Sequence, residues 1–414
     1  MRPLRQIDCF KVNMKCWKLL AIWPPNDKHS YYRYYQMFFT TFILLNNLLA
    51  TINFIFLPRQ LDMFIDEMIF YFTELAVTSK LLTFIFMREK ILKILSILES
   101  DMFQPESENG LKAIDKAKKF NVRYFKIVAV VSATAHISHI VPPILLHFIL
   151  HVKLELLVCN FSFLSDDTKQ KFIYPLYEFQ ALYMHSQVVC NISIDTFVLG
   201  ILIYAIAQLD ILDDNLRRVT DKNEIVTRAD DSIQRAEKEN ALKKLNDSII
   251  HYGELGQFCD LVQDVFSIIL FVQFARYVSI TYYVCVCVFL CVYRSICEFY
   301  FNCPSSQQPA PLQYFIFLGS YMIVMILQIL VPCWFGTRMQ DKSQQLSQAV
   351  YDCDWTAKSR YFKSSMRLFV ERANKPLTIT AGKMFPLSLT TFTSIMNSSY
   401  SFFTLLRHMQ SRQN

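Results

Sequence analysis

Residues 384–409 carry the clearest chemical pattern in this sequence. The first 23 of them include no charged side chain, and about 20 helical residues cross the hydrocarbon core of a bilayer. Hydroxyl and amide groups at Thr390, Ser394, Asn397 and Ser401 recur at steps of three and four residues, so they share one helix face. A polar face in a membrane helix lines water, but short hydroxyls also permit close helix packing. Pore lining and helix packing both stay open at this point.

Groups that could perform catalysis or hold a metal are sparse. His136 and His139 lie one helical turn apart, but no third ligand is evident. The sequence has no Gly-rich phosphate loop, nucleophile elbow or metal-spaced His/Cys cluster. We therefore expect no enzyme, no cofactor and no metal site. A disulfide between Cys159 and Cys303 stays open.

The elements that position these groups must lie in a membrane. Of the 414 residues, 53% are hydrophobic and 15% aromatic, and only seven are glycine. The net charge of +7 does not indicate nucleic-acid binding, because the basic residues lie between apolar runs and do not form one face. We predict an all-α polytopic membrane protein whose seven transmembrane helices lie near 36–57, 66–87, 127–150, 174–207, 262–293, 313–336 and 384–409.

The charge distribution predicts the orientation. Of 42 Lys and Arg residues, 32 fall on the N-terminal segment and alternate connections, and seven fall on the other side. The N-terminus is therefore predicted to be cytosolic and the C-terminus extracellular. The glycosylation sequon at Asn160 then faces outside.

The predicted organisation has six parts. They are a cytosolic N-terminal segment at 1–35, spans one to four at 36–207, a cytosolic helical extension at 208–261, spans five and six at 262–336, cytosolic anchor helices at 337–383, and the last span at 384–409. Residues 88–126 are predicted to be a solvent loop. Pro142 and Pro143 are expected to kink the third span.

The C-terminal sequence resembles that of a known family. The similarity is carried by PLTITAGK at 376–383, FPLSL at 385–389, TFT at 391–393 and SYSFFTLL at 399–406. With the predicted topology, these motifs resemble the insect odorant receptor family. The resemblance implies a ligand-gated, non-selective cation channel in the plasma membrane of sensory neurons. It implies a variable, odorant-tuned subunit that forms a heterotetramer with a shared co-receptor.

The same resemblance implies pore residues in the last helix. An apolar constriction near the outer end would fall on Leu405 and Met409, with Ser394, Ser398 and Ser401 deeper on that face. The polar stripe derived above instead includes Asn397. The two faces overlap, and the choice between them stays open.

The resemblance also implies a pocket among spans two, three, four and six for a small volatile hydrophobic ligand, inside a bundle surrounded by lipid. The residues predicted to line this pocket are Tyr71, Phe72, Leu75, His136, His139, Tyr183, Gln187, Cys190, Tyr314, Phe317 and Tyr321.

Two other receptor classes remain as alternatives. A gustatory receptor-type homotetrameric channel would show a Thr-Tyr signature followed by Gln in the last span, and Asn397-Ser398-Ser399-Tyr400 departs from it. A G-protein-coupled receptor has the opposite orientation, and no Asp-Arg-Tyr closes the third span.

Overall fold

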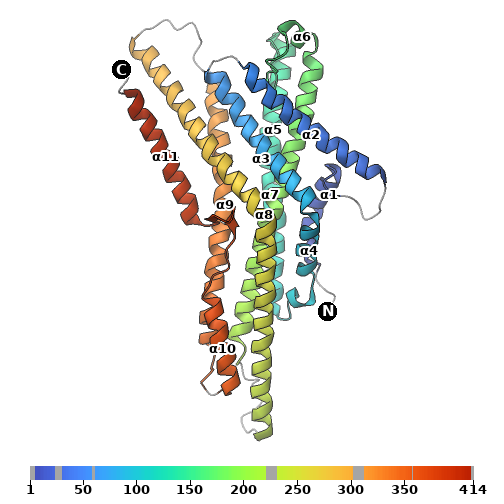
Figure 1. The fold of residues 1–414 in the computed structure, drawn as a ribbon, viewed down its shortest axis with the longest axis vertical. Helices are drawn as coiled ribbons and strands as arrows, with labels where there is room; N and C mark the ends of the chain where they lie inside the picture. The colour runs from blue at the N-terminus through green and yellow to red at the C-terminus, as the bar shows by residue number, and fades with distance from the viewer. Residues whose placement is uncertain are drawn as a thin grey trace.

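The computed structural model describes residues 5–23, 30–57, 61–220, 231–301, 312–356 and 358–411. Side chains in these ranges are described except at 30, 61–66, 69, 231–238, 278–301, 312–322, 402, 403 and 405–411. Long helices run roughly along one axis, and the C-terminus lies at the same end as the short helix α6 (Asp166–Lys171) (Figure 1).

Seven long helices correspond to the seven predicted spans. They are α2 (Ser30–Phe56), α3 (Leu61–Phe86), α5 (Glu108–Leu150), α7 (Ile173–Arg217), α8 (Asp231–Phe301), α9 (Leu312–Tyr351) and α11 (Leu389–Ser411). Within the described ranges, α2, α5, α7, α8 and α9 contain segments long and apolar enough to cross a membrane.

Residues 88–126 differ from their prediction. They form α4 (Arg88–Leu98), the short 3-10 helix η2 (Asp101–Phe103) and the start of α5. The loop prediction was wrong because α4 is amphipathic, with Ile91, Ile94 and Leu95 buried on one face. Helix α5 begins at a capped end, where the Ser107 hydroxyl accepts from the Gly110 amide. It continues through both prolines of the third span.

The N-terminal segment packs into the bundle. It comprises η1 (Gln6–Phe10) and α1 (Lys11–Leu19). The Asn13 amide donates to the Ser193 carbonyl and the Thr196 hydroxyl, both at 2.8 Å. Trp17 is fully buried against rings of α3 and α7. Burial raises the pKa of the Cys9 thiol, so this thiol stays protonated at neutral pH.

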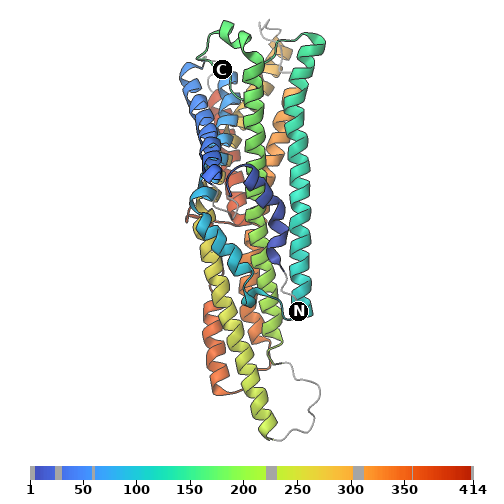
Figure 2. The same cartoon turned by 90° about the vertical axis from the view of Figure 1, so that its right-hand side faces the viewer.

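Helix α7 forms the centre of the bundle. Nearly every residue from 193 to 212 is buried, which explains its continuous apolar sequence. Its neighbours include α5, α9, α3 and α8, and Figure 2 shows it running between them. A Cβ at Gly200 would lie 2.8 Å from the Asn121 amide, so this glycine permits the close approach of α5.

The cytosolic half is built from the ends of α7, α8 and α9 together with α10 (Arg360–Ala373) (Figure 1). Helix α10 is strongly amphipathic and buries Phe362, Met366 and Phe369. The Phe369 ring lies 5.3 Å from that of Tyr252 on α8. The apolar stripes of these extensions therefore cover one another.

A two-stranded hairpin precedes the last helix. Strand β1 (Thr380–Ala381) pairs antiparallel with β2 (Phe385–Pro386), and Gly382 between them has a φ of 61°. Helix α11 begins at Leu389, five residues later than the predicted last span. Pro386 disfavours the helical conformation at Phe385, which accounts in part for the delayed start.

Candidate functional site

An inner cavity of about 210 Å³ lies among α3, α5, α7, α8 and α9. Its wall is mainly apolar, with contributions from Phe70, Val77, Val131, Val188 and Met325. Such a surface binds ligands by shape and dispersion, and a few polar groups set their orientation.

Polar side chains line the outer end of the inner cavity. His139 Nε2 lies 3.2 Å from the Leu157 carbonyl, which joins α5 to the segment that follows it. His136 Nε2 lies 3.4 Å from His185 Nδ1. Gln187 donates to the Tyr183 hydroxyl at 2.9 Å, while its own Oε1 is buried without a partner among the described residues. This half therefore offers an amide acceptor and imidazole nitrogens.

The inner end of the cavity is more strongly polar. Arg276 of α8 is 4% exposed and donates to Gln328 Oε1 of α9 at 2.6 Å. Asn191 of α7 accepts from Lys80 at 2.7 Å. Asn191, Arg276 and Gln328 all line the cavity.

Some of the predicted ligand residues line the inner cavity, and others do not. His136, His139 and Gln187 line the inner cavity together. Tyr71 bonds Thr51 of α2 at 3.0 Å. The remaining described residues do not line the cavity, since Phe72 packs on the hydrophobic core, Leu75 is 38% exposed, Tyr183 lies behind Gln187, and Cys190 is fully buried.

Several predicted residues cannot be placed in this way. The side chains of Tyr314, Phe317 and Tyr321 in α9, and of Leu405 and Met409 in α11, lie outside the described residues, as does Cys303. Their ligand, pore and disulfide roles stay predictions.

Among the lining residues with an ionisable or amide side chain, sequence reasoning missed four: Glu74, Asn191, Arg276 and Gln328. A signal was present for two of them, because an ionisable residue in an apolar span marks a candidate functional position. The other two carry amides within apolar helices, and their direction depends on how the helices pack.

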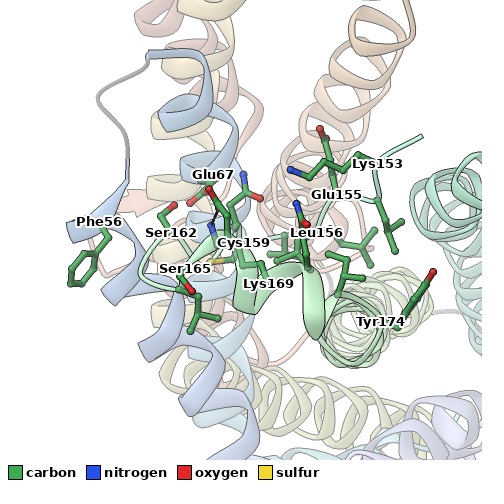
Figure 3. Close-up of a pocket in the computed structure, with 18 of the residues that line it drawn as sticks. Phe56, Glu67, Lys153, Glu155, Leu156, Cys159, Ser162, Ser165, Lys169 and Tyr174 are labelled. Carbon is green, nitrogen blue, oxygen red and sulfur yellow. Dashed lines mark hydrogen bonds and ion pairs between the residues drawn. The ribbon is translucent and has the colours of Figure 1, made fainter. Parts of the chain in front are cut away.

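A larger outer cavity of about 1060 Å³ lies beside the segment that joins α5 to α7. Figure 3 shows Glu67, Lys153, Glu155 and Lys169 around it, so its lining includes side chains of both charges. Phe70 and Val158 line both cavities. The two cavities are therefore neighbours, separated in part by these side chains.

The sequon lies at this outer cavity. Asn160 is exposed, and its backbone amide lies 3.4 Å from Glu67 Oε1. Glu67 also accepts from Asn53, whose Oδ1 in turn accepts from the Ser162 amide at 2.5 Å. These contacts hold the sequon backbone against α2 and α3 and leave the Asn160 side chain at the surface.

Over residues 389–401, helix α11 packs against α8 and α9 along one face. Phe392, Ile395 and Met396 pack on the hydrophobic core, and the Tyr277 hydroxyl donates to the Met396 sulfur at 2.7 Å. The opposite face is exposed, and it holds the described members of both predicted pore faces: Ser394, Asn397, Ser398 and Ser401. The packing of one subunit therefore does not distinguish the two faces.

Hydrogen bonds attach the base of α11 to α8 and α9. Gln263 of α8 bonds both the carbonyl and the amide of Thr380, at 2.8 and 2.6 Å. Ser267 of α8 accepts from the Gly382 and Lys383 amides, at 2.9 and 3.2 Å. The Leu389 amide donates to the Thr337 hydroxyl of α9 at 2.8 Å.

Known structures share this fold. The structure of the insect olfactory receptor OR5 from Machilis hrabei in complex with eugenol matches with a TM-score of 0.78 at 14% identity, over 98% of this chain and 100% of that chain. A second structure of that receptor matches with a TM-score of 0.77, also at 14% identity, over 96% of each chain. These matches support the predicted all-α fold with seven membrane helices.

Sequence comparisons identify the family. Odorant receptor 59a of Drosophila melanogaster is 39% identical over 103 residues, which is 25% of each chain. Odorant receptor 2a of the same species is 34% identical over 122 residues, or 27% of this chain and 31% of that receptor. The aligned parts thus span about a quarter to a third of these relatives. The family model described as 7tm Odorant receptor matches residues 60–400. As the C-terminal motifs predicted, this multi-pass membrane protein belongs to the 7tm odorant receptor family.

Proposed function

We propose that this chain is the odorant-binding subunit of a cation channel opened by small volatile molecules. The observation that carries the proposal is that α8 and α9 both line the inner cavity and both hold the base of α11. Arg276 and Gln328 line the cavity. Ser267 lies nine residues before Arg276 on α8, and Thr337 lies nine residues after Gln328 on α9. Both bond the segment that leads into α11. Nine helical residues span about 14 Å.

The mechanism follows from this shared attachment. A ligand that fills the inner cavity favours one spacing of α8 and α9, because it contacts both helices. A change in that spacing alters the position at which α11 begins. The exposed hydroxyl face of α11 would line a central pore, and Leu405 with Met409 would form its apolar constriction. A narrow apolar ring excludes water and blocks ions until it widens.

The proposed assembly is a heterotetramer with shared co-receptor subunits in the plasma membrane of sensory neurons. The one-sided packing of α11 supports an assembly, because its polar face has no described protein neighbour within this subunit. Four such helices around an axis would enclose that face and separate it from lipid.

Co-expression tests the proposal. Cells that express this chain with the odorant co-receptor should show cation currents when a volatile panel is applied, and cells with either subunit alone should not respond to the same compounds. Surface labelling of an extracellular C-terminal tag checks delivery and orientation. Currents without the co-receptor would favour the homotetrameric gustatory type of channel. A tag accessible only after permeabilisation would contradict the orientation.

A further inference from the structure

Two buried cations lie in the membrane bundle near the inner cavity. Lys80 of α3 is fully buried and Arg276 of α8 is 4% exposed. A buried cation in a membrane protein is costly unless a carboxylate or several acceptors compensate its charge.

Lys80 is fully compensated. Its ammonium group lies 2.6 Å from Asp195 Oδ1 and 2.7 Å from Asn191 Oδ1. This pair therefore occupies the Asp195 carboxylate of α7.

Arg276 is not compensated in the same way. Its described hydrogen-bond partner is the neutral amide oxygen of Gln328. No carboxylate within the described part of the chain forms an ion pair with it, and its Nε is buried without a partner. Because Arg276 also lines the inner cavity, a group bound there can reach this guanidinium.

Glu74 is the acidic residue of the inner cavity lining. It is six residues before Lys80 on α3, or about 9 Å along the helix, and it neighbours Tyr183. No ion pair between Glu74 and Arg276 occurs among the described residues.

Resting on the proposed odorant-receptor function, we propose that the inner cavity binds a short-chain organic acid as its carboxylate, with Arg276 as the carboxylate-binding residue. The carboxylate accepts from the Arg276 guanidinium, since arginine is well suited to charge-assisted bonds with carboxylates. The hydrocarbon tail lies along Val77, Val188 and Met325. The volume of about 210 Å³ is below the roughly 300–1,000 Å³ typical of drug-sized ligands, which fits a short tail.

Isomeric ligands test the inference. Hexanoic acid and methyl pentanoate have the same atoms, and only the acid carries a charge at neutral pH. We expect hexanoate to activate the receptor assembled with its co-receptor at about tenfold lower concentration, because a charge-assisted hydrogen bond contributes about 1.5–3 kcal/mol. A series of acids with four to eight carbons shows which tail length activates the receptor best. Hexan-1-ol and hexylamine test whether an alcohol or an amine is preferred to the acid.

Two variants test whether Arg276 causes the preference for the acid over the ester. Arg276→Gln should remove the preference for the acid over the ester, whereas the control Met325→Leu should shift the potency of both compounds together. Surface expression is measured for each variant. If Arg276→Gln does not reach the surface, the thermal stability of the wild-type receptor complex in detergent supplies the second measurement, with hexanoate expected to raise the Tm more than methyl pentanoate.

The outcomes separate this inference from the proposed function. Currents evoked by the ester, alcohol or amine with no advantage for any acid would overturn the inference and leave the odorant-gated channel standing. A preference for the alcohol would point to Gln187 Oε1, and one for the amine to Glu74. Stabilisation by hexanoate without any current would support the acid site but contradict the channel. A panel that produces neither current nor stabilisation would overturn the acid site.

Discussion

At the scale of single residues, the buried Lys80–Asp195 pair ties α3 to α7 inside the membrane. The Lys80 side chain is 1% exposed and that of Asp195 is 21% exposed. Removal of one member leaves a charge without its partner in a medium of low polarity, and this is more costly than the absence of both.

We therefore expect Lys80→Met to destabilise the folded receptor by about 3–5 kcal/mol. The measurements are the Tm in detergent and the fraction of the receptor at the cell surface. The double variant Lys80→Met with Asp195→Leu should recover part of the loss, because it removes both charges. A single variant with wild-type stability would show that Lys80 contributes little to the bundle.

Which residues would line the inner cavity was only partly predictable. His136, His139 and Gln187 were identified from the pocket that the family resemblance implies, and all three are polar side chains within apolar spans. Arg276 and Glu74 gave the same signal, but their place in the bundle depends on the rotation of α8 and α3. That rotation is set by contacts between helices far apart in sequence, which one sequence does not display.

At the scale of elements, the hairpin and Gly336 fix the base of α11. A Cβ at Gly336 of α9 would overlap the Leu387 carbonyl oxygen and lie 2.9 Å from its carbonyl carbon. Leu387 itself is 3% exposed and donates its amide to Ile379 at 2.7 Å. The base of α11 thus packs directly on the α9 backbone.

Gly336→Ala should displace this base and reduce the ligand-evoked current per surface receptor. Overpacking of this kind costs roughly 1–3 kcal/mol, because a backbone group must move. Gly256→Ala on α8 is the matched control, since a Cβ there meets no atom within 4 Å. Whole-cell current divided by surface signal is the measurement. Equal ratios for Gly336→Ala and wild type would show that this contact does not affect opening.

The elements themselves differed in how well their sequences predicted them. Long apolar runs defined the spans, because each must satisfy its backbone within a helix. The hairpin was not predicted, since strands of two residues have no periodicity. The burial of Trp17 was also missed, because its aromatic sequence fits a membrane interface as well as a core.

At the scale of the whole molecule, orientation decides which sequons can be used. Asn160-Phe161-Ser162 lies beside the outer cavity, and Asn246-Asp247-Ser248 lies in the extension of α8 predicted to be cytosolic. Asn160 and Asn246 are both exposed. Only the sequon on the extracellular side can meet the glycosylation machinery.

We expect removal of N-glycans with a glycosidase to increase the gel mobility of the wild-type protein. Asn160→Gln should abolish this shift, and Asn246→Gln should retain it, because only Asn160 would carry a glycan. A shift that depends on Asn246 would reverse the orientation derived from the Lys and Arg distribution.

The one-sided packing of α11 has a consequence for the life of a newly made subunit. A solitary chain would present Ser394, Asn397, Ser398 and Ser401 to lipid tails, where polar groups lose the partners that water provides. The Ser394 and Ser398 hydroxyls bond carbonyls of their own helix, which lessens this cost, but the Asn397 amide has no such bond in the described residues. The face that would hydrate an ion in the assembled pore therefore also penalises a subunit that stays alone, and this penalty gives the cell a physical basis for retaining unassembled receptors.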